Sequence, residues 1–229
     1  MIPVGDDNTQ RRLFPVVTWA LVIINVLVFL LELAGGDKFI YTWSFTPAYF
    51  SANPTAYFIT IFTSMFMHAG WLHLGGNMLY LLIFGDNVED RFGHFKFLIF
   101  YILCGMAATF AQYVLAPYVE VPNLGASGAI AGVLGAYLIL MPGQRIRVLL
   151  GMWIVRLPAI LVIGVWIGLQ LFSGIGTLAS MSASKGGVAY MAHIGGFFAG
   201  VLLTFFFRKR QRSIYLPPAS TGGNYTIQS

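Results

Sequence analysis

The sequence predicts an all-α, polytopic membrane protein in which six transmembrane helices form one bundle. Of its 229 residues, 58% are apolar and only 9% are charged, whereas soluble domains carry about 25% charged residues. Uncharged stretches recur along the chain, several of them close to the roughly 20 residues that a helix needs to cross a bilayer. The length accommodates these helices and their loops, but no further soluble domain of ordinary size.

Prolines, glycines and charged residues mark the ends of the six expected helices. The helices are expected at residues 13–31, 71–85, 97–116, 127–141, 148–172 and 186–207. The first is too long for the apolar region of a cleaved signal peptide, which spans about 7–15 residues. The fourth must end near Met141, because Pro142 and Gly143 follow directly.

The connections between these helices differ in composition. Residues 35–67 mix prolines, charges and many aromatic side chains, and Trp and Tyr favour the headgroup level of a bilayer. We therefore expect a long, membrane-associated first loop. Residues 86–96 are expected to form a charged turn, and residues 173–185 a loop rich in glycine and serine.

The basic residues gather at one set of helix ends. Eleven of the thirteen lie there, namely Arg11, Arg12, Arg91, Lys96, Arg145, Arg147, Arg156, Arg208, Lys209, Arg210 and Arg212. The positive-inside rule then places both termini in the cytoplasm. The membrane is expected to be a plasma membrane or a bacterial inner membrane. Residues 1–12 would form a cytoplasmic segment, residues 13–208 the membrane domain and residues 209–229 a disordered cytoplasmic tail. Because the basic residues form no patch, we expect the lipid bilayer and not nucleic acid as a partner.

Two residues at membrane depth point to nucleophilic chemistry. Ser127 lies among glycines and alanines at residues 125–132, and His193 lies in an apolar stretch whose only other ionisable side chain is Tyr190. An ionisable group inside a membrane is a functional candidate by default. A serine hydroxyl becomes a nucleophile when a neutral imidazole accepts its proton. We therefore expect Ser127 to be a nucleophile and His193 its base.

The expected topology brings further polar groups to the same depth. Helices two, four and six run inward from the outer face, so Asn77, Ser127 and His193 lie about 8–10 Å below that face. An oxyanion needs hydrogen-bond donors, and His73, Asn77 and the backbone N–H of Gly128 are suitable. The acidic residues of the 86–96 turn are expected on the opposite side, so the sequence permits a dyad without an acid.

Small residues four apart indicate close packing between two of these helices. Gly128 and Gly132 in the fourth helix, and Ala192, Gly196 and Gly200 in the sixth, form such a pattern. Small residues let membrane helices approach closely, and a direct contact between Ser127 and His193 requires such an approach.

These motifs together resemble the rhomboid family of intramembrane serine proteases. They comprise Gly125-Ala126-Ser127-Gly128, Ala192-His193 followed by Gly196 and Gly200, H-x4-H-x3-N at His68, His73 and Asn77, and Glu89-x-Arg91. The resemblance implies a six-helix rhomboid-like bundle that cleaves transmembrane protein substrates with a Ser127–His193 dyad. It also implies an oxyanion site at His73 and Asn77, gating by the first loop and the fifth helix, and no metal or other cofactor. Many family members carry an aromatic residue one turn after the serine, where this chain has Ala131.

Other functions remain open at this level. A catalytically inactive relative that binds transmembrane segments would share the fold, and loss of Ser127 or His193 would mark it; both are present. A transporter would favour paired broken helices in two repeated halves, and only one short helix is expected here. His68 and His73 lack the spacing that places two zinc ligands on one helical face, and a structural hydrogen bond is expected for His68.

Overall fold

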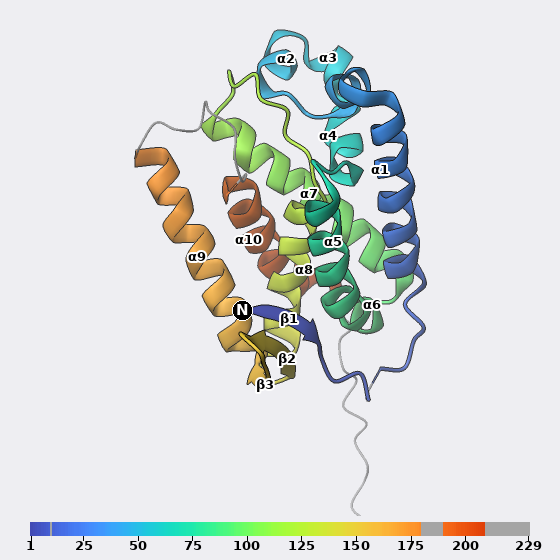
Figure 1. The fold of residues 1–229 in the computed structure, drawn as a ribbon, viewed down its shortest axis with the longest axis vertical. Helices are drawn as coiled ribbons and strands as arrows, with labels where there is room; N and C mark the ends of the chain where they lie inside the picture. Colours follow the sequence, from blue (N-terminus) through green and yellow to red (C-terminus); the bar gives the residue numbers. More distant parts are fainter. Residues whose placement is uncertain (10, 180–189, 209–229) are drawn as a thin grey trace, which may run out of the picture.

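The computed structural model describes residues 1–9, 11–179 and 190–208, and most of them are helical (Figure 1). The long helices are α1 (Val16–Trp43), α5 (Trp71–Tyr80), α7 (His94–Leu115), α8 (Ser127–Leu140), α9 (Ala159–Ala179) and α10 (Tyr190–Phe207). Within the described residues, four helices are long and apolar enough to cross a membrane: α1, α7, α9 and α10. The chain is thus a mostly helical, multi-pass membrane protein, and the count of six spans stays a prediction.

Helix α8 lies at the centre of the bundle, packed against α7 and α10 (Figure 1). Every residue from Gly128 to Tyr137 is buried, as expected for a helix that is apolar on all sides. Its 14 residues span about 21 Å, less than the roughly 30 Å of a hydrocarbon core. Ser127 therefore starts a helix that is shorter than the bilayer and enclosed by protein.

Two helices run further than the sequence predicted. Helix α1 continues beyond residue 31 to Trp43, with one non-helical residue at Gly36, whose φ of 58° only glycine adopts readily. The second helix does not end at residue 85. It passes through the π-helical turn η2 (Leu81–Gly85) into α6 (Asp86–Phe92), and Gly93 breaks it before α7 begins. The expected charged turn at 86–96 is therefore wrong, since most of it is helical.

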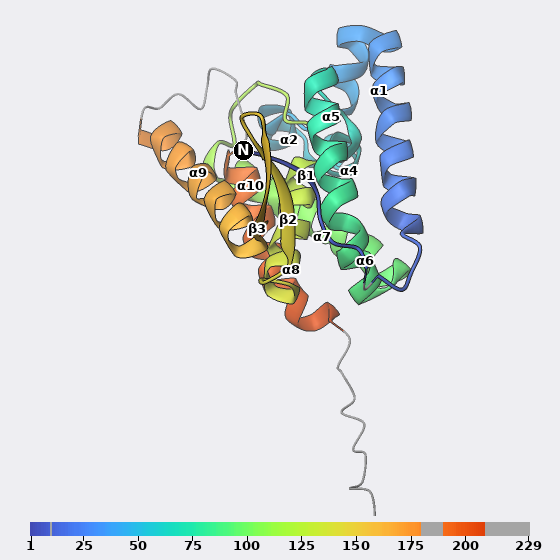
Figure 2. The ribbon, with the colours of Figure 1, turned by 60° about the horizontal axis from the view of Figure 1, so that its bottom comes forward.

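The chain is mostly helical, as predicted, but it also forms a small antiparallel sheet that the all-α prediction did not include. Strand β2 (Arg145–Leu150) pairs with β3 (Trp153–Pro158) and with β1 (Ile2–Gly5), and Figure 2 shows the three strands side by side next to the end of α8. The fifth helix consequently begins at Ala159, not at residue 148. Periodicity alone does not separate a short apolar strand from a buried helix.

Some of the segments predicted near the C-terminus lie outside the described residues. Helix α9 occupies the first part of the expected 173–185 loop, up to Ala179. The rest of that loop, residues 186–189 of the sixth predicted helix and the predicted tail at 209–229 lie outside the described residues. Residues 1–12, predicted as a separate segment, include β1 and so join the sheet.

The first loop folds into short helices: α2 (Pro47–Ala52), α3 (Pro54–Tyr57), α4 (Thr60–Thr63) and the 3₁₀ turn η1 (Ser64–Phe66). Prolines start α2 and α3, where a missing N–H costs nothing. The loop is tied to the connection between α7 and α8. Phe45 and Asn123 exchange two backbone hydrogen bonds, and the N–H of Gly125 donates to the carbonyl of Ser64 (2.9 Å). The first loop thus holds the backbone that leads into Ser127.

Carboxylates of α6 anchor the start of α1 at the end of the bundle where α8 ends (Figure 1). Glu89 accepts hydrogen bonds from the backbone N–H groups of Val17 and Thr18 (2.9 and 2.8 Å) and from the Thr18 hydroxyl (2.7 Å). The first N–H groups of a helix have no partner within the helix and favour negative charge. Glu89 therefore caps α1, whereas Arg91 is exposed.

Asp6 gives this end of the molecule a pH-dependent stability. Its Oδ2 accepts from the Tyr137 hydroxyl (2.7 Å) and from Asn87 Nδ2 (2.8 Å), and burial raises the pKa of Asp6 to about 6. The unfolded value is near 3.9, so the folded state binds more protons between the two values. Stability therefore falls as the pH rises from about 4 through about 6.

Asp6→Asn is expected to flatten this fall, because an amide oxygen still accepts the Tyr137 hydrogen bond but does not ionise. Thermal unfolding midpoints of detergent-purified protein between pH 4 and pH 7 measure the effect. Asp7→Asn is the matched control, because Asp7 is exposed and hydrogen bonds from Thr9 lower its pKa. An unchanged slope in Asp6→Asn would contradict the assignment.

Candidate active site

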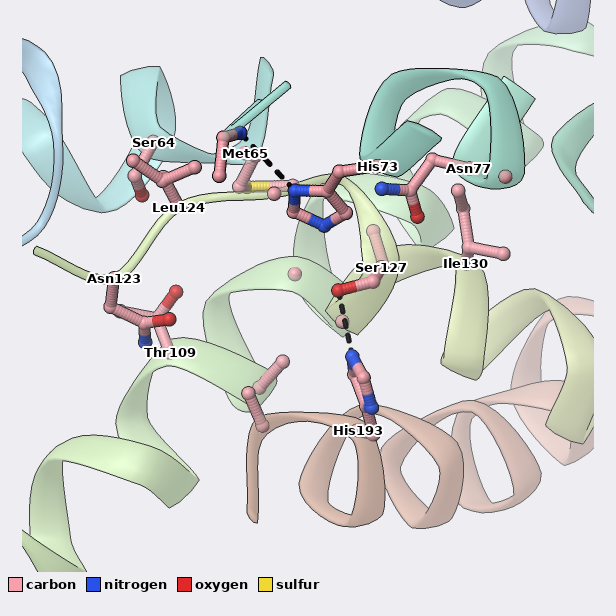
Figure 3. Close-up of a pocket in the computed structure, with 18 of the residues that line it drawn as sticks. Ser64, Met65, His73, Asn77, Thr109, Asn123, Leu124, Ser127, Ile130 and His193 are labelled. Carbon is pink, nitrogen blue, oxygen red and sulfur yellow. Dashed lines mark hydrogen bonds between the residues drawn. The ribbon is translucent and has the colours of Figure 1, made fainter. Parts of the chain in front are cut away.

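A pocket of about 820 Å³ lies between α5, α7, α8 and α10, beside the chain that leads into α8. Figure 3 shows how side chains from these separate elements point into it. Ser127, His193, His73 and Asn77 all line the pocket, together with Gly128. The structure therefore brings together all five residues that the sequence predicted for catalysis and the oxyanion.

Ser127 and His193 are in direct contact. Ser127 Oγ lies 2.8 Å from His193 Nε2, as the dashed line in Figure 3 marks. Ser127 is the first residue of α8, and His193 lies in the first turn of α10. A hydroxyl at this distance from an imidazole nitrogen is within the reach that proton transfer requires.

Close packing of α8 against α10 makes this contact possible. A Cβ on Gly196 would lie 2.0 Å from the backbone oxygen of Gly128, and a Cβ on Gly200 would lie 2.1 Å from that of Gly132. Neither backbone atom can move aside as a flexible side chain would. Gly132 and Gly200 do not line the pocket, so their place is in the helix contact.

His73 and Asn77 face Ser127 from α5, on the side away from His193 (Figure 3). His73 Nδ1 accepts a hydrogen bond from the N–H of Ala69 (3.3 Å), so the ring proton of the neutral imidazole sits on Nε2. Asn77 Nδ2 is buried and has no hydrogen-bond partner among the described residues. An unpaired buried donor is costly, and here it leaves an N–H group available beside the nucleophile.

Gly125 allows the chain to pass between His73 and Ser127. Its φ of 136° lies in the region that favours glycine. A Cβ at this position would lie 3.1 Å from His73 Nε2 and 3.5 Å from Ser127 Oγ. It would therefore occupy the space between the nucleophile and the imidazole N–H. Gly128, the second residue of α8, adds a backbone N–H at a helix start, where no carbonyl of the helix accepts it.

His68 differs from its prediction. Its ring nitrogens are buried without a hydrogen-bond partner in the part of the chain that the structure describes, so the expected side-chain hydrogen bond is not found. The ring packs edge-on against His73, with centroids 5.1 Å apart, and the backbone N–H of His68 donates to Glu32 Oε2 (2.9 Å). Burial, and to a lesser extent the nearby His73, lowers the pKa of His68 to about 4. His68 is therefore neutral at pH 7.

Two residues of α9 contact His193, and neither was predicted from the sequence to lie in the site. Gln170 Oε1 lies 2.9 Å from His193 Nδ1, and the Trp166 ring lies 5.9 Å from the imidazole at 39°. An aromatic side chain of α9 thus contacts the histidine. Ala131, at the position where many family members carry an aromatic residue, is buried in α8. The one available signal was Gln170 itself, the sole side-chain amide in an almost entirely apolar helix.

No three His, Cys, Asp or Glu side chains gather to hold a metal ion within residues 1–9, 11–179 and 190–208. Among the residues that the structure describes, the titratable side chains lining the pocket are two histidines and one tyrosine, with no Asp, Glu, Lys or Arg. Its chemistry is therefore that of hydroxyls, two imidazoles, two side-chain amides and backbone N–H groups.

Comparison with known proteins identifies the family. A rhomboid domain matches residues 55–210, a range that holds the whole pocket. Rhomboid protease GluP of Bacillus subtilis is 31% identical over 195 residues, which is 82% of this chain and 35% of that protein. Rhomboid-like protein 11, chloroplastic, of Arabidopsis thaliana is 27% identical over 213 residues, covering 89% and 69%. Rhomboid protein 1, mitochondrial, of Saccharomyces cerevisiae is 31% identical over 155 residues, covering 66% and 42%.

The chain therefore spans less than half of two of these three relatives. The match to the family model nevertheless covers more than half of this chain and includes every helix from α5 to α10. On this match, and with the motifs in family order, the protein is a member of the rhomboid family.

Proposed function

We propose that this protein is an intramembrane serine endopeptidase that hydrolyses peptide bonds in or near transmembrane segments of other membrane proteins. The observation that carries the proposal is the 2.8 Å contact between Ser127 Oγ and His193 Nε2. It lies in a pocket enclosed by apolar helices, and one of the relatives is named a rhomboid protease.

The contacts support a two-step acyl transfer. In the first step, Ser127 Oγ attacks the peptide carbonyl while His193 Nε2 takes the hydroxyl proton and then gives it to the leaving amine. In the second step, His193 Nε2 takes a proton from water as the water attacks the acyl carbon, and it gives that proton to Ser127 Oγ as the ester bond breaks and the acid product leaves. The oxyanion of each tetrahedral intermediate would accept hydrogen bonds from His73 Nε2–H, Asn77 Nδ2–H and the N–H of Gly128.

The membrane orientation is part of this proposal. The protein would lie in the cell membrane with both termini in the cytoplasm. Single cysteines in a Cys104→Ser background test it, because Cys104 is the only cysteine and is buried. Met152 and Tyr118 are 95% and 82% exposed and follow α8 and α7 in the chain. An impermeant maleimide added to intact cells should label a cysteine at Tyr118 and not one at Met152. The reverse pattern would overturn the orientation.

The proposed function is tested with purified protein in detergent and a generic single-span model substrate. Wild-type protein should cut the substrate in or near its span, and Ser127→Ala protein should not. A folded wild-type protein that binds the substrate without cutting it would favour the alternative, a catalytically inactive rhomboid-like protein that binds transmembrane segments.

Asn77→Ala is expected to lower kcat about 100- to 1,000-fold with little change in KM. Loss of one oxyanion donor costs about 2.7–4 kcal/mol in a soluble serine protease, and the remaining donors, His73 and Gly128, would set the lower end of this range. Initial rates on the model substrate over a range of concentrations separate kcat from KM. An unchanged kcat in a stably folded variant would remove Asn77 from the oxyanion site.

A further inference from the structure

The second ring nitrogen of His193 has a partner of its own. We propose that Gln170 is a positioning residue that fixes the tautomer and the orientation of the catalytic base. The inference rests on the proposed function, because it assigns a role within the same site. It goes beyond a two-residue dyad by giving the base a third, uncharged group.

Two side chains on one face of α9 contact the His193 ring. Gln170 Oε1 lies 2.9 Å from His193 Nδ1, and Trp166, four residues earlier and so on the same helical face, lies against the same imidazole. The imidazole is therefore held at one nitrogen by an amide and on its ring by an indole. Its other nitrogen is left facing Ser127 Oγ.

The chemistry of the two contacts selects one tautomer. A neutral imidazole carries a proton on only one nitrogen, and the partner of one nitrogen decides the role of the other. A carbonyl oxygen can only accept, so Nδ1 must carry the proton and donate to Gln170 Oε1. Nε2 then keeps its lone pair and accepts the Ser127 hydroxyl proton, as a general base must.

Other groups around His193 do not offer this control. The titratable side chains that line the pocket besides His193 are His73 and Tyr80, both on α5. His73 lies on the far side of Ser127 (Figure 3). Within the described residues, the hydrogen-bond partners of the His193 ring are Ser127 and Gln170 alone.

The placement of Gln170 in α9 supports a role beyond packing. Helix α9 is otherwise almost entirely apolar, and an amide in a membrane helix is unfavourable unless it bonds to a partner across helices. Gln170 satisfies its carbonyl at the imidazole that acts as the base. A leucine would fill a similar volume without the hydrogen bond.

The tautomer itself is the most direct test, and it does not depend on proteolysis. Nitrogen-15 NMR of histidine-labelled protein is recorded in the Ser127→Ala background, with the His193 signals assigned by their absence in Ser127→Ala/His193→Ala. We expect a protonated Nδ1 and an unprotonated Nε2. Adding Gln170→Leu should give a mixture of tautomers. A protonated Nε2 with Gln170 present, or no change with Gln170→Leu, would overturn the proposal.

Kinetics give the second test. Gln170→Leu should lower kcat about tenfold, the order expected for the loss of one buried hydrogen bond, with KM unchanged. Gln170→Glu keeps an acceptor at Nδ1 and should restore kcat. Its negative charge should also move the acidic limb of the pH–rate profile to higher pH, because it stabilises the imidazolium. A residue that only packs would not give this shift.

Leu169→Ala is the matched control, because Leu169 lies on the same helix and is 60% exposed. This variant should have the kcat and the pH profile of the wild-type protein. If Gln170→Leu fails to fold, Gln170→Glu still decides through the pH profile. Equal rates and profiles for wild type, Gln170→Leu and Gln170→Glu would overturn the proposal. If wild type itself shows no proteolysis, the proposed function fails, and the NMR result still decides whether Gln170 sets the tautomer.

Discussion

Ser127→Ala is expected to abolish cleavage of a transmembrane substrate, and His193→Ala is expected to do the same, while both variants stay folded. The two side chains are 2.8 Å apart and act in one proton transfer. Residues that act as a unit have strongly non-additive effects, with single losses about as large as the loss of all members, on the order of 10⁶ in kcat in a soluble serine protease. The double variant should therefore be little worse than either single variant.

A fluorophosphonate probe separates an activated serine from one that only packs. The probe resembles the tetrahedral intermediate, so it labels a serine that has a base on one side and oxyanion donors on the other. Wild-type protein should be labelled once, at Ser127, and His193→Ala should lose the label. Asn77→Ala should be labelled more slowly, since His73 and backbone N–H groups remain.

These experiments have a clear contrary outcome. Substantial cleavage by Ser127→Ala would remove Ser127 as the nucleophile. Failure of the wild-type protein to react with the probe, beside a serine hydrolase that does react, would favour the inactive relative. Variants in the first loop, or at Trp166 where α9 lines the pocket, should impair cleavage of a transmembrane helix more than labelling by the small probe, if those elements admit the substrate.

Gly196→Ala is expected to destabilise the protein more than the other helix substitutions proposed above. The added Cβ would lie 2.0 Å from the Gly128 backbone oxygen and 3.3 Å from Ala108 Cβ. Since the first contact is with backbone, α8 and α10 must move apart. Overpacking of this kind costs about 1–3 kcal/mol and sometimes more, and the movement also lengthens the distance between Ser127 and His193.

Thermal unfolding in detergent and cleavage assays measure both consequences. Gly164→Ala is the matched control, because a Cβ at this position of α9 has no described atom within 4 Å and alanine is the better helix former. We expect a lower unfolding midpoint and reduced cleavage for Gly196→Ala, and neither for Gly164→Ala. Equal stability and activity of the two variants would show that the close approach of α8 and α10 is not needed.

The sequence by itself determined the class of the protein and much of its candidate site. Apolar stretches, scarce charges and prolines are local signals, and they located the long helices to within a few residues at most ends. The rarity of ionisable groups in such stretches was enough to single out His193, and the glycines around Ser127 at the start of an apolar helix singled out the serine. The spacing of His73 and Asn77 on one helix, and of the glycines on two others, is likewise readable without a structure.

Only the tertiary structure decided which distant segments meet. Strand β1 pairs with β2 across more than 140 residues, and an apolar alternation does not reveal its partner. The continuation of helix through Asp86 and Glu89 depends on Arg11 and the start of α1, which satisfy those carboxylates. The partners of His193 on α9 are the clearest case. Nothing local to Gln170 or Trp166 indicates an imidazole, because the hydrogen bond exists only after α9 packs against α10.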